Sequence, residues 1–150
     1  SVQAALNGYL NHWAQDETSA EPALALIVLL DQITRNIYRN DSRMVAGDTI
    51  ALLTARKLVA DGRDQSLLPV QRQFCYMPFE HAEALEMQHE SLRLFRSLQV
   101  FPGTGDLLVY AERHAVIIER FGRFPHRNEL LGRVSTPEEI EFLKLPGSGF

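Results

Sequence analysis

The chain has 150 residues, of which 45% are hydrophobic and 23% are charged, as in soluble globular proteins. This composition excludes disordered and fibrous proteins, and the length fits one domain with a sizeable core. Fifteen basic residues against nineteen acidic ones give a net charge of −4, so we expect no nucleic acid and no membrane among the partners. Cys75 is the single cysteine, which excludes an internal disulfide and is typical of a reducing cytosol.

The apolar runs and the start of the chain favour a cytoplasmic protein. The longest apolar run, Ala23 to Leu30, is far shorter than the roughly 20 residues that span a bilayer. Residues 1–20 lack the basic start and the apolar block of a signal peptide. Because helical spacing is present from Ser1 onward, we predict a single helical domain over 1–150 that lacks an upstream segment.

Apolar residues recur at helical spacing almost throughout, and strict alternation is absent, so the sequence predicts an all-α fold. Pro78 is expected to open a helix, and Gly62 and Gly122 to end helices in the left-handed conformation. Short links between long helices favour antiparallel neighbours and therefore stacked helical hairpins. The seven expected helices cover about 2–15, 21–39, 45–61, 66–75, 79–98, 105–121, and a last one from the capping signal at 135–139 to about 144.

Polar side chains interrupt the apolar stripes of three expected helices. His114 lies in the middle of the inner face of the helix over 105–121. In the helix over 21–39, Asp31 and Arg35 form an i,i+4 pair with the acid first, which is the more favourable order. Taken singly, these residues are more simply explained as a neutral core histidine and a structural ion pair.

The third interrupted stripe belongs to the expected helix over 79–98. His81, Gln88 and His89 fall on or beside its inner face. Buried polar groups need partners, and groups from three helices that all point inward are the nearest partners for one another. We therefore predict one shared polar cluster.

A basic loop follows the helix over 105–121. Between Arg120 and Arg133, four arginines stand against one glutamate in a chain that is acidic overall. Arginine forks bind carboxylate or phosphate with two hydrogen bonds, so an anion-binding loop beside His114 is one interpretation. A solvated loop whose arginines pair with helix ends is the other. The residues expected to bind the ligand here and in the helices are Arg35, Gln88, Arg120, Arg123, His126, Arg127 and Asn128.

Three segments resemble signatures of the uncharacterised bacterial family known as domain of unknown function 924. They are Asp31 to Arg39, Tyr76 to Glu83 with Gln88 following, and Tyr110 to His114 continued by Arg120 to Asn128, Leu131 to Arg133 and Ser135-Thr136. The third segment is long and specific, and the resemblance covers nearly the whole chain. It implies an all-helical, tetratricopeptide-like superhelical fold and no established activity. Fold analogy by itself suggests protein interaction.

Two departures from the family pattern concern the possible site. Thr34 stands where family members often carry proline. The aromatic-rich segment with which members begin is absent, so any site residue that it supplies is missing.

The spacing of the histidines and acids along the chain gives little support for a metal site or for a cysteine nucleophile. Glu86-x-x-His89 occurs once, whereas helical two-metal sites use this spacing twice. His81 and His89 are about 12 Å apart along a helix at roughly 1.5 Å per residue, too far for one ion. Cys75 lacks an adjacent histidine and an orienting acid. We therefore predict no metal site and no cofactor.

Acid–base chemistry fits the residues better. His114, His81 and Asp31 can supply a base and its orienting carboxylate, while the arginines hold an anionic group. The leading prediction is a helical domain that binds a small anionic ligand or peptide in an Asp/Arg/His/Asn pocket. A small cytosolic hydrolase or transferase acting on a phosphorylated or carboxylated substrate is the first alternative. The second is a protein-interaction scaffold with a purely structural polar core.

Overall fold

All regular structure in the chain is helical, as the sequence predicts. The computed structural model describes residues 1–150 and contains no strand. Because α2, the π-helical segment η2 (Val28–Ile33) and α3 follow one another without a break, the chain forms seven helices. The α-helical bounds are α1 Val2–Leu6, α2 Glu21–Ile27, α3 Thr34–Ile37, α4 Asp48–Ala60, α5 Pro69–Glu80, α6 Leu85–Ser97, α7 Gly105–Phe121 and α8 Pro137–Leu143.

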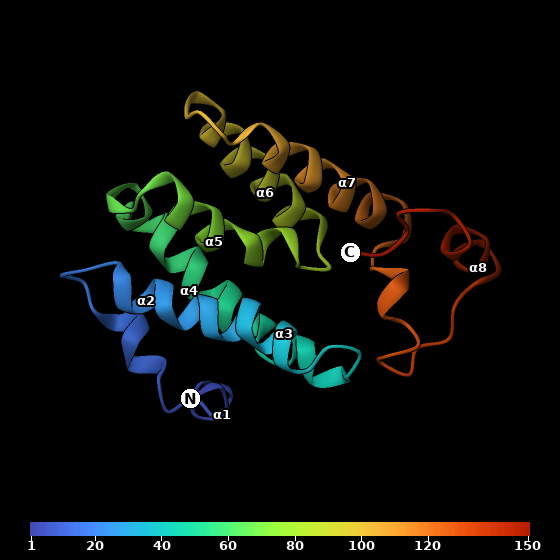
Figure 1. Cartoon of the computed structure of the whole chain (residues 1–150), viewed down its shortest axis with the longest axis horizontal. Coiled ribbons are helices and arrows are strands. Elements are labelled where there is room, and N and C mark those ends of the chain that lie inside the picture. The colour runs from blue at the N-terminus through green and yellow to red at the C-terminus, as the bar shows by residue number, and fades with distance from the viewer.

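The helices form layers in which neighbours along the chain pack together. Figure 1 shows α2 and α3 in one line, with α5, α6 and α7 stacked beside each other above them. Helix α6 packs against both α5 and α7, and α4 packs against both α2 and α5. None of the helices combines the length and the apolar character needed to cross a bilayer. The tetratricopeptide-like superhelical arrangement stays a prediction.

The core lies between these layers. Its main cluster joins α2, α4, α5, α6 and α7, and its largest fully buried side chains are Tyr76, Phe79 and Phe95. A second cluster around Leu26 and Leu30 holds the N-terminal segment. A third cluster of Ile117, Ile118 and Phe124 fixes the basic loop against α7. The buried Phe124 thus anchors a loop rich in arginine.

The first expected helix is interrupted. We expected it over 2–15, but α1 ends at Leu6 and a separate 3-10 turn, η1, covers Asn11–Gln15. Gly8 lies between them with φ of +80°, a left-handed conformation that stops a right-handed helix. The chain therefore turns here, and both pieces pack against the α2–η2 rod.

The expected boundary at Pro78 is wrong. Helix α5 runs from Pro69 to Glu80 with Pro78 inside it, and α6 begins only at Leu85. Proline lacks the amide N–H of the helical ladder, and α5 ends two residues after it. His81 is consequently the C-cap residue of α5 and does not share a helix with Gln88.

The expected ends of the last helices are confirmed. Helix α7 covers Gly105–Phe121 and stops at Gly122, which has φ of +73°. Helix α8 starts with a capping box, in which the Thr136 hydroxyl accepts from the Glu139 N–H and the Glu139 carboxylate accepts from the Thr136 N–H. These local signals position the basic loop between two well-defined helix ends.

The π-helical segment η2 places Asp31 inside the protein. Its wider turn lets the Thr34 hydroxyl donate to the Leu29 carbonyl oxygen at 2.8 Å, and both Asp31 and Thr34 are fully buried. Single π-turns inside α-helices occur frequently at functional sites. Thr34, which departs from the family pattern, thus lies only three residues after the buried Asp31.

Replacing Gly47 with alanine should lower the free energy of unfolding by about 2 kcal/mol, because the added methyl group overpacks a tight contact. Its Cβ would lie 2.7 Å from the Leu30 carbonyl oxygen and 2.9 Å from Leu30 Cβ. Urea unfolding followed by circular dichroism measures the loss. Gly105→Ala is the matched control: a Cβ there meets nothing within 4 Å, so this variant should be unchanged or slightly more stable. Equal losses in both variants would contradict the steric explanation.

Candidate functional site

A buried ion-pair cluster joins η2, the end of α5 and the start of α4. The Asp31 carboxylate lies 2.6 Å from His81 Nδ1 and 3.1 Å from Arg35 Nη1. The Arg35 guanidinium also donates two hydrogen bonds to Asp48, at 2.7 and 2.8 Å. Burial raises the pKa of Asp31, but the charge and hydrogen bond of His81 and the charge of Arg35 outweigh it, so this pKa lies below its usual value. Asp31 therefore stays ionised and orients His81.

Gly47 makes the contact between Asp48 and Arg35 possible. Its lack of a side chain lets the start of α4 approach the backbone of Leu30, and α4 begins at the next residue, Asp48. Asp48 in the first turn of α4 then reaches Arg35 on α3. Asp31 from the preceding helical turn and Asp48 from the next helix thus meet at one guanidinium.

His114 faces this cluster from the middle of α7. Its ring centroid is 6.0 Å from that of His81, and its Nδ1 lies 2.7 Å from the Tyr110 carbonyl oxygen. Since a carbonyl only accepts, Nδ1 carries the proton and the lone pair is on Nε2. Burial lowers the pKa of His114 to about 3, so the ring is neutral near pH 7. The Phe150 ring stacks on it at 3.7 Å between centroids.

Glu80 adds a buried carboxylate that our sequence reasoning missed. The residue is 5% exposed, and its carboxylate lies 3.9 Å from His114 Nδ1, beyond hydrogen-bond distance. Burial, together with the nearby charge of Asp31, raises the pKa of Glu80 to about 8. A signal was present in the sequence, because Glu80 directly precedes His81 in the second family-like segment.

Arg127 brings the basic loop to the same place. Its guanidinium donates to the His81 carbonyl oxygen at 3.1 Å and lies over the Phe124 ring at 4.6 Å. The nearest carboxylate oxygens, from Glu83 and Asp48, are 3.8 and 3.9 Å from Nη1. Arg127 is 7% exposed, so it is a buried cation without a close ion pair.

These side chains surround a cavity of about 440 Å³, which we call the basic cavity. Asp31 lies behind it and holds His81 and Arg35, whereas His126 lies in its wall with a buried Nδ1 that has no hydrogen-bond partner. The lining contains no acidic residue. It consists of Arg35, Asn36, Arg39, Asn40, Met44, His81, His114, His126, Arg127 and Phe150.

A second cavity of about 370 Å³, the glutamate cavity, adjoins the first. His81, His114 and Phe150 line both cavities, and Glu80 lines only the second. Glu80, His81 and His114 each place a possible ligand atom within 4.8 Å of the other two, so this group can hold a metal ion. The two cavities together thus join a basic wall to a carboxylate–histidine group.

Comparison with known proteins agrees with this architecture. The model of the family described as "Bacterial protein of unknown function (DUF924)" matches residues 1–147. The chain belongs to the DUF924 family. No curated protein matches it. The solved structure of ATU0120, a protein of unknown function from Agrobacterium tumefaciens, is 40% identical with a TM-score of 0.85, over 95% of this chain and 77% of that one.

Two of the expected anion-binding arginines do not reach the cavities of this DUF924 chain. Arg123 pairs with Glu139 at 2.8 Å and also donates to the Val134 carbonyl oxygen. Arg120 pairs with Glu138 at 3.2 Å on the surface. Both arginines follow the pattern of the structural alternative, in which loop arginines bind a neighbouring helix. The early acids of α8 provide the partners.

Gln88 and Asn128 also have structural contacts outside the basic cavity. The Gln88 amide donates to the carbonyl oxygens of Glu80 and Ala82, each at 2.8 Å, which satisfies the end of α5. Asn128 donates to Ser135 and to Glu139. These amides fix the segments that carry His81 and Arg127 and do not line the basic cavity.

Glu83 and Arg133 form a hub that sequence reasoning missed. Arg133 donates to both carboxylate oxygens of Glu83, at 2.9 and 3.1 Å, and Glu83 accepts from the Phe124 N–H at 2.7 Å. Burial raises the pKa of Glu83, but the hydrogen bonds from Arg133 and Phe124 prevail and lower it. This hub ties the basic loop to the α5–α6 turn, next to His81.

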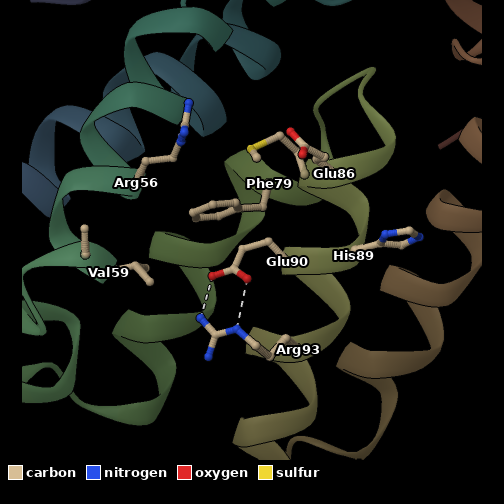
Figure 2. A pocket seen from close by; sticks show the side chains of 9 residues that line it. Arg56, Val59, Phe79, Glu86, His89, Glu90 and Arg93 are labelled. Carbon is tan, nitrogen blue, oxygen red and sulfur yellow. Dashed lines mark hydrogen bonds and ion pairs between the residues drawn. The ribbon is translucent and has the colours of Figure 1, made fainter.

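A separate groove of about 540 Å³ in the DUF924 chain lies between α4 and α6. Figure 2 shows Arg56 and Val59 on one side and a Glu90–Arg93 ion pair on the other. Glu86 and His89 leave α6 in different directions in this view, so their Glu-x-x-His spacing does not bring two metal ligands together. None of the expected catalytic residues lies in this groove.

Proposed function

We propose that the chain binds a small anionic ligand, with a phosphate or carboxylate group, in the basic cavity. The observation that carries this proposal is the charge of the wall, which contains three arginines and no acid. Arg35 is neutralised from behind by Asp31 and Asp48, whereas Arg127 has no carboxylate closer than 3.8 Å. Arg39, an exposed residue on the rim, has no ion-pair partner. The three arginines against the carboxylates of Asp31 and Asp48 therefore leave an excess of about one positive charge at the wall.

The donors in this wall suit an oxyanion. A guanidinium binds phosphate or carboxylate with two parallel hydrogen bonds, and such bonds strengthen where water is excluded. Asn36 and Asn40 add amide donors at the same opening, and the unpartnered Nδ1 of His126 adds a further polar atom. A cavity of about 440 Å³ accommodates a small metabolite rather than a folded partner.

Isothermal titration calorimetry with inorganic phosphate and with small dicarboxylates tests this proposal. We expect saturable binding that weakens in salt, and at least tenfold weaker binding for Arg127→Gln because a charged hydrogen bond is lost. Arg39→Ala should also weaken binding, without the risk that comes from altering a buried residue. Arg120→Ala is the matched control and should bind like the parent, because Arg120 lies outside the cavity. Absence of binding in the parent, or equal loss in the control, would refute the assignment.

A hydrolase or transferase is the second candidate, and the Asp31–His81 contact of 2.6 Å favours it. A carboxylate that accepts from Nδ1–H leaves Nε2 as a general base facing both cavities. His81 and His114 would be the catalytic residues, with Asp31 as the positioning residue behind them. A screen of phosphoester and amide substrates against the parent and His114→Ala tests this candidate. Turnover that the variant loses supports an enzyme, and binding without turnover in the parent supports a binding protein.

A further inference from the structure

We propose that Glu80, His81 and His114 bind one divalent transition-metal ion of the zinc class, with an open coordination position toward the glutamate cavity. The inference goes beyond the anion site and stands without it. The anion site depends on the arginines of the basic cavity, and none of the three metal ligands is an arginine. Two consecutive residues at the end of α5 meet the middle of α7 to form the group. Only the tertiary fold creates it, since 33 positions separate His81 from His114.

The spacing of the donor atoms suits a single ion after a small adjustment. One ligand atom from each residue lies within 4.8 Å of the other two. Ligands at about 2.0–2.1 Å around a tetrahedral ion are roughly 3.4 Å apart, so a contraction of at most about 1.4 Å closes the group. All three side chains are largely buried, and Glu80 and His81 lie at the end of a helix where such a movement does not break the helical ladder.

Both histidines already make the outer contact that metal-binding histidines need. His81 Nδ1 contacts the Asp31 carboxylate at 2.6 Å, and His114 Nδ1 contacts the Tyr110 carbonyl oxygen at 2.7 Å. A carboxylate or a backbone carbonyl on one ring nitrogen is the usual arrangement when the other nitrogen binds a metal. The Nε2 atom of each ring has no protein partner, and in the neutral ring with its proton on Nδ1 it carries the free lone pair.

The surroundings of the Glu80 carboxylate are an independent observation that favours a cation at this place. Its side chain is 6% exposed and accepts no hydrogen bond, and its nearest basic group is the neutral ring of His114 at 3.9 Å. A buried carboxylate without a donor is costly unless a cation or a proton neutralises it. A dication between Glu80 and the two rings would supply that charge directly.

The ligand types select the class of ion. Two imidazoles and one carboxylate suit zinc, cobalt, nickel or iron, whereas calcium and magnesium prefer oxygen ligands alone. Structural zinc sites use four protein ligands, and sites with three keep the remaining position for water or substrate. Here that position faces a cavity of about 370 Å³, which supplies room for such a molecule.

The test uses the full chain without an affinity tag, stripped of metal, in a buffer without phosphate. Calorimetry with zinc chloride should show one equivalent bound, and cobalt should give the visible absorption of a low-symmetry four-coordinate site. Glu80→Gln and His114→Gln should each weaken binding by at least about tenfold. Asp31→Asn should weaken it by about 10–100-fold through the orientation of His81. The control, His89→Ala on the exposed face of α6, should bind like the parent.

A measurement on the parent protein keeps the test decisive if a variant fails to fold. In heteronuclear NMR, zinc should shift the ring nitrogens of His81 and His114 and leave those of His12 and His89 in place. No binding to the parent, or shifts confined to other histidines, would overturn the proposal. So would stoichiometric binding that survives in folded Glu80→Gln and His114→Gln. A parent that binds zinc but no phosphate would support the metal site while refuting the anion site.

Discussion

Asp31→Ala is expected to lower the free energy of unfolding by about 3 kcal/mol, because a fully buried carboxylate holds several partners at once. Asp31 is 0% exposed and contacts His81, Arg35 and the Gln32 amide. Alanine leaves the His81 ring and part of the Arg35 guanidinium without an acceptor inside the protein. Urea unfolding at pH 7, followed by far-ultraviolet circular dichroism, measures the change.

Asp106→Ala is the matched control for that substitution. Asp106 is an exposed acid in the first turn of α7, where its interaction with the helix dipole contributes about 0.3–1 kcal/mol. Asp31→Asn should fall between the two, because it keeps the shape but loses the charge. If Asp31→Ala cost no more than Asp106→Ala, the ion-pair cluster would not be a determinant of stability.

Glu139→Ala is expected to cost about 3 kcal/mol, since one buried side chain completes a helix cap and two loop contacts. Glu139 accepts from Arg123 at 2.8 and 3.0 Å, from Asn128 at 3.1 Å and from the Thr136 N–H at 2.9 Å. Its loss frees the basic loop from α8. Denaturant unfolding gives the cost, and Glu138→Ala, which removes only an exposed pair with Arg120, should stay within about 1 kcal/mol.

The same carboxylate predicts a pH dependence. The hydrogen bond from Arg123 holds the pKa of Glu139 far below its model-compound value of 4.5. Such a group stabilises the fold fully above the unfolded-state pKa, and the stabilisation is lost as pH falls through the lower folded-state value. The difference in unfolding free energy between the parent and Glu139→Gln should therefore shrink below about pH 4.5. A difference that stays constant on acidification would show that the charge of Glu139 is not what stabilises the loop.

Part of the site could be predicted because polar residues on apolar stripes must find partners. Arg35 and His114 lie on α-helices, so their inward direction follows from spacing, whereas Asp31 lies in a π-helical turn; the structure brings all three together. His81 reaches the same place for a different reason, since Pro78 lies inside α5 and the helix ends just before this residue. Arg120 and Arg123 pair with acids of α8, and the number of arginines in a loop does not reveal which acids lie opposite them.

Glu80 shows the limit of spacing arguments most clearly. No periodic rule gives a single glutamate at a helix end a special status, and its significance depends on His114 and Asp31 across the fold. Spacing along one expected helix pairs His81 with His89 as possible metal ligands. The group that meets in space instead combines the end of α5 with the middle of α7.

The amino-acid pattern alone specified the helices, the left-handed stop at Gly122 and the capped start of α8, because these features depend on neighbours within about four residues. Folding in three dimensions decided which polar groups meet, since contacts between distant segments depend on helix packing. The close approach at Gly47 brings Asp48 to Arg35, and the Glu83–Arg133 hub brings Arg127 to His81. The two cavities exist only where these layers come together.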